Sequence, residues 1–142
     1  QANLAKPGWG ERFRAESFDM ILSFAVLHHL PGDLIRKSFL YSIRRLLAVG
    51  GEFMLSTWQF KNSERLSERV QPWEAAGISE NDVDPGDYLL DWRHGGQGLR
   101  YVHLFGEDEL VSLAQSTGFM VKDSFLSDGE GGRLGLYQVW AK

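Results

Sequence analysis

The sequence predicts an α/β fold in which parallel strands alternate with helices and the sheet ends in an antiparallel hairpin. Residues 18–24 form an almost continuous apolar run, which precedes a helical pattern over 34–47 and a second strand pattern over 52–57. That order is typical of a parallel strand–helix–strand unit. Two further strand patterns, at 119–126 and 134–141, are joined by a short glycine-rich link, which favours an antiparallel pair.

The elements of the parallel unit follow from local patterns. Residues 18–24 lack the alternation of a half-exposed strand, so we expect this strand to be buried on both faces. Asp33 suits the N-cap of the next helix, whose apolar residues recur at helical spacing while its arginines take other faces. Gly50 and Gly51 are expected to end that helix before the next strand begins.

A long segment over 58–105 separates the parallel unit from the hairpin. It contains a polar stretch over 61–70 that suits a short helix, and prolines and glycines interrupt the rest, so we expect it to be irregular. A connection of this length between sheet elements is more often functional than idle. Acidic residues from Glu107 then begin a helix that Gly118 ends.

Composition narrows the classes of function. The chain has 142 residues, no cysteine and a formal net charge of −4. Without cysteine there is no disulfide framework and no thiolate metal site, which fits the cytoplasm as the expected location. An acidic chain is not drawn to polyanions by its net field, so nucleic-acid binding would need a local basic patch. No apolar run approaches the ~20 residues of a membrane span, and we expect no membrane partner.

Three segments, in chain order, carry a resemblance to a known family. They are Phe18–Ser23, the run Ala25–Pro31 with the sequence AVLHHLP, and Leu46–Phe53 with the sequence LLAVGGEF. Together they resemble the second half of a class I S-adenosylmethionine-dependent methyltransferase. In that family the fourth strand ends in a V-L-H-H-L loop and the fifth follows L-x-P-G-G, where Val49 here replaces the proline. The resemblance implies the C-terminal part of a Rossmann-like sheet, and residues 1–142 then form one partial methyltransferase domain.

The resemblance also implies which residues contact the cofactor. Asn3 and Leu4 look like the family's aspartate–leucine pair, and with Ala25, Val26 and His28 they are the candidate S-adenosylmethionine contacts. The family's glycine-rich turn and its acidic ribose ligand have no counterpart in this sequence. We therefore expect the cofactor to bind weakly or not at all, and the chain to be inactive by itself.

A narrower resemblance lies in the second half. The segments Gly86–Trp92 and Arg100–Phe105, followed by a helix containing Glu109, are similar to the tRNA wobble-uridine methyltransferases, which esterify a carboxymethyl group on uridine. Val102 replaces a tyrosine of that group, and Asp128–Gly131 departs from its closing motif. The implied methyl acceptor is a small molecule or a modified tRNA wobble uridine, and 58–105 would form the acceptor side.

Candidate substrate-binding residues lie in this insert. Trp58 follows a predicted strand at its carboxyl end, where it either walls the acceptor site or covers the sheet edge. Arg100 and His103 are three residues apart and could face one ligand, since the planar guanidinium suits a carboxylate or a phosphate. The alternative is a surface ion pair of Arg100 with Asp87 or Asp91.

A basic and aromatic cluster in the same insert is of the type that stacks on nucleic acid. It also suits a small-molecule pocket. The cluster consists of Trp92, Arg93, His94, Arg100 and Tyr101.

No catalytic residue is assigned, because the cofactor's sulfonium is a strong electrophile and a carboxylate acceptor needs no general base.

Two adjacent histidines, His28 and His29, stand at the carboxyl end of the first predicted strand, where open α/β sheets bind ligands. We expect their loop to close over the cofactor; the alternative is that a histidine merely caps the strand. A metal site is not expected, because a third ligand such as His103 has no motif spacing. An α/β-hydrolase using either histidine is a weak alternative, because the sequence has no G-x-S-x-G motif.

The resemblance has a consequence for assembly. Without the family's first strands, the inner edge of Phe18–Phe24 is unpaired, and a long apolar edge invites pairing with another chain. We expect a dimer or larger homo-oligomer through this strand, or a partner chain that carries the missing half. The alternative function is a non-catalytic partner subunit or pseudoenzyme that docks on a methyltransferase.

Overall fold

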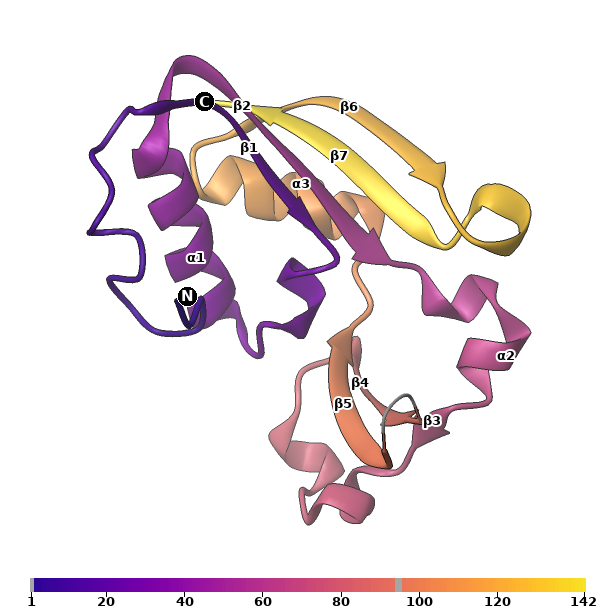
Figure 1. Cartoon of the computed structure of the whole chain (residues 1–142). Helices are drawn as coiled ribbons and strands as arrows, with labels where there is room; N and C mark the ends of the chain where they lie inside the picture. The colour runs from indigo at the N-terminus through magenta and orange to yellow at the C-terminus, as the bar shows by residue number, and fades with distance from the viewer. Residues whose placement is uncertain (1, 94–95) are drawn as a thin grey trace.

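The computed structural model describes residues 2–93 and 96–142, which form two sheets and three α-helices (Figure 1). The strands are β1 (Phe18–Phe24), β2 (Leu47–Trp58), β3 (Val70–Gln71), β4 (Asp87–Trp92), β5 (Gly98–His103), β6 (Met120–Ser127) and β7 (Gly135–Ala141). The α-helices are α1 (Asp33–Leu46), α2 (Glu64–Ser67) and α3 (Glu107–Ser116). Short 3-10 turns are η1 (Leu27–His29), η2 (Phe60–Asn62), η3 (Trp73–Ala76), η4 (Glu80–Asp82) and η5 (Glu130–Gly132).

The larger sheet has the strand order β1-β2-β7-β6. Strands β1 and β2 are parallel and α1 connects them, whereas β2–β7 and β7–β6 are antiparallel. The predicted α/β class, with a parallel unit and a closing hairpin, is confirmed. The final helix begins at Glu107, as predicted, and Gly118 follows its C-cap with a φ of 84°.

The junction between α1 and β2 differs from the prediction. The N-cap of α1 is Gly32, and Asp33, the predicted N-cap, is the first residue of the helix. The helix ends at Leu46, and β2 begins directly at Leu47. Gly50 and Gly51 therefore lie inside the strand and do not end the helix. Gly51 suits this position because a Cβ would lie 3.0–3.2 Å from three backbone carbonyl oxygens.

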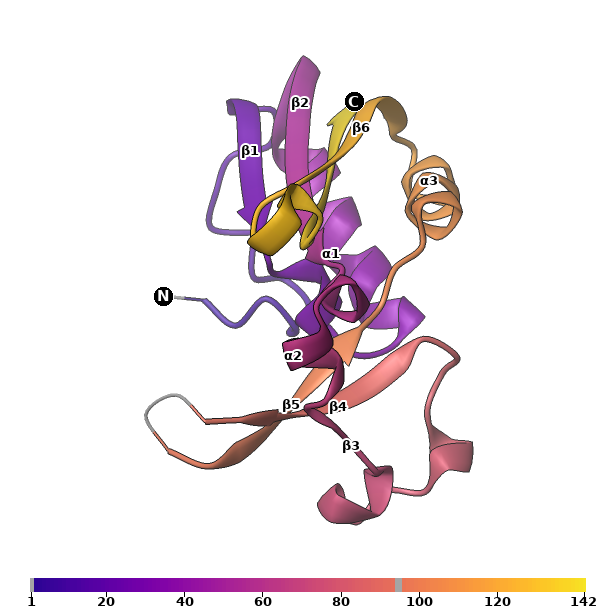
Figure 2. The ribbon, with the colours of Figure 1, turned by 90° about the vertical axis from the view of Figure 1, so that its right-hand side faces the viewer.

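The core lies on one face of the larger sheet, where α1 and α3 both pack (Figure 2). Apolar residues of β2 and β7 alternate toward the helices, which is the period-two pattern of a strand with one covered face. The two helices present apolar side chains to this face of the sheet at helical spacing. This core includes Phe53 and Leu55 of β2, Leu136 and Trp140 of β7, Phe39, Leu40 and Ile43 of α1, and Leu110, Leu113 and Ala114 of α3.

The expectation that β1 is buried on both faces is wrong. Of its seven residues only Ser23 is buried, and Met20, Leu22 and Phe24 are 54%, 56% and 46% exposed. The reason is the position of the strand at the edge of the sheet. Within the described residues both long helices pack on the face that Ile21 shares, and Met20, Leu22 and Phe24 lie on the opposite face. An apolar run indicates what a strand can bury, but not what is present to cover it.

The insert is more regular than predicted. Strands β3, β4 and β5 form an antiparallel sheet beyond the carboxyl ends of β1 and β2 (Figure 1). The predicted short helix is present as α2. A small core is formed by Phe60 together with Leu90 of β4 and Val102 of β5. None of the helices in the described ranges is both long and apolar enough to cross a bilayer.

Candidate functional site

A strained turn at the carboxyl end of β1 begins the candidate site. Ala25 follows β1 directly and has a φ of 54°, which costs a residue with a Cβ on the order of 1 kcal/mol. Its backbone N–H donates to the carbonyl oxygen and to the hydroxyl of Ser56, at 3.1 Å each, and these bonds hold the turn. The turn directs the chain into η1, which carries both histidines. Strain of this kind is concentrated at functional sites.

His28 is a buried, neutral member of this loop. Its side chain is fully buried and lies over the Trp58 ring, with ring centroids 5.3 Å apart. Its Nδ1 accepts a hydrogen bond from the Trp58 backbone N–H at 3.2 Å, so the proton of the neutral ring is on Nε2. Burial, reinforced by the nearby His29 and Arg100, lowers the pKa of His28 to about 3.

His29 has the opposite tautomer. Its Nδ1 donates to the Tyr101 carbonyl oxygen at 2.9 Å, which leaves Nε2 with a lone pair in the neutral ring. Burial lowers the pKa of His29, the bond to Tyr101 opposes that shift, and the charge of Arg100 adds to it. The loop therefore presents one histidine whose free nitrogen is a hydrogen-bond acceptor.

Arg100 is held by two tryptophans. Its guanidinium carbon lies 3.5 Å from the Trp92 ring centroid and 5.9 Å from that of Trp58. Stacking of this kind orients the planar guanidinium while leaving its edge donors available. Two of the candidate substrate-binding residues, Trp58 and Arg100, are therefore neighbours in the structure. A shallow cavity of about 610 Å³, widely open to solvent, has Ala25, His29, Trp92, Arg100 and Tyr101 among its lining residues.

The expectation that His103 faces the same ligand as Arg100 is wrong. Successive side chains of a strand point to opposite faces, so residues three apart in β5 diverge. His103 is 2% exposed, and its two ring nitrogens contact Asp87 Oδ1 at 2.5 Å and Glu109 Oε1 at 2.8 Å. It belongs to a structural network and not to the Arg100 cavity.

The alternative ion pairs for Arg100 are also absent from the described contacts. Asp91 pairs with Arg93 at 2.6 Å, and Asp87 pairs with Arg36 at 3.2 Å. The basic and aromatic cluster is therefore only partly assembled: Trp92 stacks with Arg100, whereas the Tyr101 ring lies on the other face of β5. His94 lies outside the described residues.

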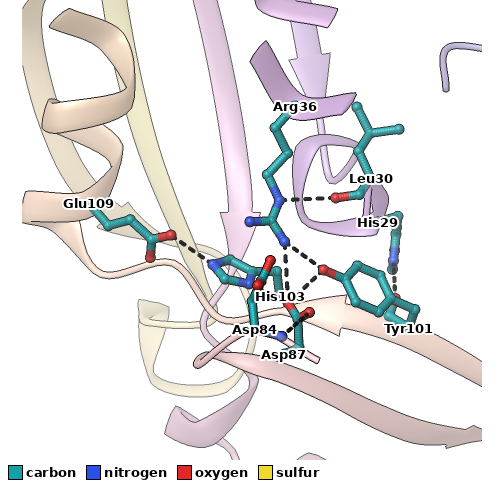
Figure 3. A network of polar contacts seen from close by, with 8 residues as sticks. All are labelled: His29, Leu30, Arg36, Asp84, Asp87, Tyr101, His103 and Glu109. Atoms are coloured by element: carbon teal, nitrogen blue, oxygen red, sulfur yellow. Dashed lines mark hydrogen bonds and ion pairs between the residues drawn. The ribbon is translucent and has the colours of Figure 1, made fainter. Parts of the chain in front are cut away.

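The network around Asp87 was not predicted from the sequence (Figure 3). Asp87 Oδ1 accepts hydrogen bonds from Arg36, from the Tyr101 hydroxyl and from His103. Burial acts to raise the pKa of Asp87, but the hydrogen bonds from Tyr101 and His103 outweigh it and the pKa is lowered. One signal was available: Arg36 stands in the first turn of a helix, where the macrodipole disfavours a cation. Such a residue suggests a specific anionic partner.

The candidate cofactor residues are dispersed. Asn3 is exposed and its side-chain oxygen accepts a hydrogen bond from the Ala5 N–H at 3.1 Å, while Leu4 and Val26 pack partly against the core. Ala25 lines the Arg100 cavity. No acidic residue is among the residues that line this cavity, and a sulfonium would face the positive charge of Arg100 there. The lining of this cavity therefore suits an anionic group.

The described residues contain no group of three or more histidines and acids arranged to hold a metal ion. The polar cluster of His103, Asp87 and Glu109 is internally hydrogen-bonded.

The sheet with its reversed closing hairpin has the fold of S-adenosylmethionine-dependent methyltransferases, and the chain is similar in sequence to members of that family. Residues 8–55 match the family model described as a methyltransferase domain. An unconfirmed methyltransferase of Encephalitozoon cuniculi is 38% identical over 108 residues, which are 75% of this chain and 47% of that protein. The human "probable tRNA methyltransferase 9B" is 32% identical over 71 residues, or 48% of this chain and 16% of that protein.

Solved structures agree on the fold. An S-adenosylmethionine-dependent methyltransferase from Methanosarcina mazei superposes with a TM-score of 0.69 at 20% identity, covering 99% of this chain and 64% of that one. The 1,6-didemethyltoxoflavin N1-methyltransferase of Burkholderia thailandensis, solved with S-adenosylhomocysteine, gives 0.61 at 21% identity, covering 94% and 47%. The chain spans about half the length of the first relative, at 47%.

Proposed function

We propose that the chain supplies the acceptor side of an S-adenosylmethionine-dependent methyltransferase whose acceptor carries a carboxylate. The observation that carries this proposal is Arg100, stacked on Trp92 and lining the cavity that also contains His29. A guanidinium fixed by ring stacking can bind a carboxylate through two parallel hydrogen bonds. The acceptor would then be held in one orientation beside the strained turn at Ala25.

The chemistry required of the chain is modest. The bound cofactor supplies an electrophilic methyl group. Transfer to a carboxylate forms an O–C bond, breaks an S–C bond and releases a neutral thioether, so no proton moves. Arg100 would orient the carboxylate, and the free Nε2 of His29 would accept a hydrogen bond from a hydroxyl or N–H of the acceptor. Trp92, which lines the cavity, would cover one side of the reacting carboxylate.

A carboxymethylated wobble uridine of tRNA fits this cavity as the acceptor. The similarity to "probable tRNA methyltransferase 9B" supports it, as does the pairing of an aromatic surface for a base with a cation for a carboxylate. A small carboxylic acid is the other acceptor class. His103 is no longer a candidate, because both of its ring nitrogens are already engaged.

The cofactor contacts remain a separate part of the proposal. Asn3, Leu4, Ala25 and Val26, with Nε2 of His28, would approach S-adenosylmethionine from the loops beside β1. We expect weak or no cofactor binding by this chain alone, since no acidic residue is among those that line the cavity to accept hydrogen bonds from the ribose hydroxyls. Calorimetric titration with S-adenosylmethionine tests this, and tight binding would contradict it.

We predict that Arg100→Gln weakens binding of 5-carboxymethyluridine at least tenfold, because the guanidinium is the carboxylate partner. Binding is measured by NMR titration of this chain, with uridine as the ligand lacking the carboxylate. Arg93→Gln is the matched control: Arg93 lies beside the same hairpin, but its side chain is exposed and paired with Asp91. Equal affinity for the two nucleosides, or equal effects of the two substitutions, would contradict the proposal.

A second candidate function rests on β1. Its outer edge pairs with no strand among the described residues, and Met20, Leu22 and Phe24 are exposed on one side of it. We propose that this strand associates with a second copy, or with a chain that carries further methyltransferase elements, so that the chain acts as a partner subunit. The absence of cysteine supports the cytoplasm as the place where it acts.

A further inference from the structure

Arg36 connects α1 to two other parts of the molecule (Figure 3). It is 4% exposed, and its Nε donates to the Leu30 carbonyl oxygen at 3.0 Å. Its Nη2 donates to the Tyr101 hydroxyl at 2.5 Å and lies 3.2 Å from Asp87 Oδ1. A buried guanidinium that bonds to three groups fixes their relative positions, because each bond restricts a rigid planar donor.

Tyr101 is hydrogen-bonded both through its side-chain hydroxyl and through its backbone carbonyl. Its hydroxyl accepts from Arg36 and donates to Asp87 Oδ1 at 2.6 Å, while its backbone carbonyl accepts from His29 Nδ1 at 2.9 Å. Leu30 and His29 are adjacent in the chain, so Arg36 acts on the histidine loop by two routes. One route is direct, through the Leu30 carbonyl, and the other passes through Tyr101.

The same arrangement places Arg100. Tyr101 and Arg100 are neighbours on β5 and project from opposite faces, so anchoring the Tyr101 ring on the α1 side fixes Arg100 on the cavity side. His103 extends the anchor to α3, because its two nitrogens join Asp87 and Glu109. The insert sheet is thereby fastened to both long helices.

We propose that Arg36 and Tyr101 are positioning residues, which fix His29 in its Nδ1-protonated tautomer and align it with Arg100 across the cavity. Neither side chain needs to touch the acceptor for this role. The alignment of the two cavity groups rests on the proposed function, but the control of the His29 tautomer does not. A site whose groups are held by a second layer of hydrogen bonds loses binding energy when that layer loosens.

The test is Tyr101→Phe, which removes the hydroxyl and keeps both the ring and the carbonyl. Long-range ¹H–¹⁵N NMR spectra of the histidine rings report the tautomer of His29 directly. We expect one tautomer in the wild type, and in the variant a second set of shifts from the Nε2-protonated form. Tyr41→Phe is the matched control, because the exposed Tyr41 hydroxyl contacts only the Ser116 carbonyl among the described contacts.

A second pair of variants keeps the test decisive if Tyr101→Phe folds poorly. Arg36→Lys retains the charge but replaces the separate Nε and Nη2 donors with a single ammonium group, whereas Arg44→Lys alters a partly exposed arginine of the same helix. We expect Arg36→Lys to disturb the His29 tautomer and to weaken 5-carboxymethyluridine binding about tenfold, and Arg44→Lys to change neither.

The outcomes separate the two proposals. If Tyr101→Phe and Arg36→Lys lower the melting temperature but leave the His29 shifts unchanged, the network is only structural and the positioning role is overturned. If the shifts change as expected while wild type binds no 5-carboxymethyluridine, the positioning of His29 stands and the proposed acceptor fails.

Discussion

At the residue scale, the candidate site depends on which nitrogen of each histidine carries the proton. His28 accepts from a backbone N–H and His29 donates to a backbone carbonyl, so adjacent residues have opposite tautomers. The sequence indicated a ligand loop from the position of the pair at the end of a strand. It could not distinguish the two rings, because the partners, Trp58 and Tyr101, lie 30 and 72 residues away.

The burial of His28 predicts a pH-dependent stability. Its pKa of about 3 lies below the ordinary 6.5, so between these values the unfolded chain binds a proton that the folded chain excludes, and stability falls as pH falls. We expect the free energy of unfolding to drop by about 2 kcal/mol more in the wild type than in His28→Asn between pH 7.5 and pH 5.

Urea denaturation at the two pH values measures this difference. Asparagine preserves an acceptor for the Trp58 N–H, and His29 is present in both proteins, so its own titration cancels. A parallel pH dependence in wild type and variant would show that His28 is not the group responsible.

At the element scale, local patterns identified the elements of the larger sheet, whereas the hairpin of β4 and β5 was missed. Residues 87–92 and 98–103 pair over six positions, yet prolines and glycines nearby favoured an irregular segment. The strands are stabilised by contacts with residues distant in sequence, such as Phe60 against Leu90 and Val102. β-structure depends on such neighbours more than on local preference.

The end of α3 provides an element-scale prediction. Gly118 has a φ of 84°, and a Cβ there would lie 2.8 Å from Arg44 Nε, which donates to the Gly118 carbonyl. We expect Gly118→Ala to lower the free energy of unfolding by about 1–2 kcal/mol, measured by urea denaturation. Gly106→Ala, at the N-cap of α3, is the control: its φ is −79° and no atom lies within 4 Å of its Cβ position, so a smaller loss of about 0.5 kcal/mol is expected. Equal losses would argue against the left-handed turn as the cause.

At the scale of the whole molecule, helices cover one face of the larger sheet, and no helix in the described ranges covers the other face. Phe125 stacks on Tyr137, which also contacts Phe24, so exposed apolar side chains extend from β1 across to β6. Contiguous apolar surface of this kind marks an interaction site. This apolar surface is continuous with the edge of β1 that pairs with no strand among the described residues.

We predict that wild type self-associates and that Leu22→Lys abolishes the association, because a lysine on an edge strand opposes strand pairing. Light scattering after size-exclusion chromatography measures the molar mass. Leu34→Lys is the matched control, since Leu34 is 84% exposed on α1, away from β1. A wild-type chain that stays monomeric across the concentration range would refute pairing between copies.

The order of the strands and helices of the larger sheet, its closing hairpin and the position of the two histidines just after β1 followed from patterns along the chain, because periodicity is a local property. The side on which His103 points, the burial of Arg36 and the exposure of β1 were decided only in three dimensions. Arg36 and Asp87 are 51 residues apart, and although the helix position of Arg36 suggests an anionic partner, nothing local identifies Asp87 as that partner. Packing of α1 against the insert sheet brings them together, and that packing orders the site around His29 and Arg100.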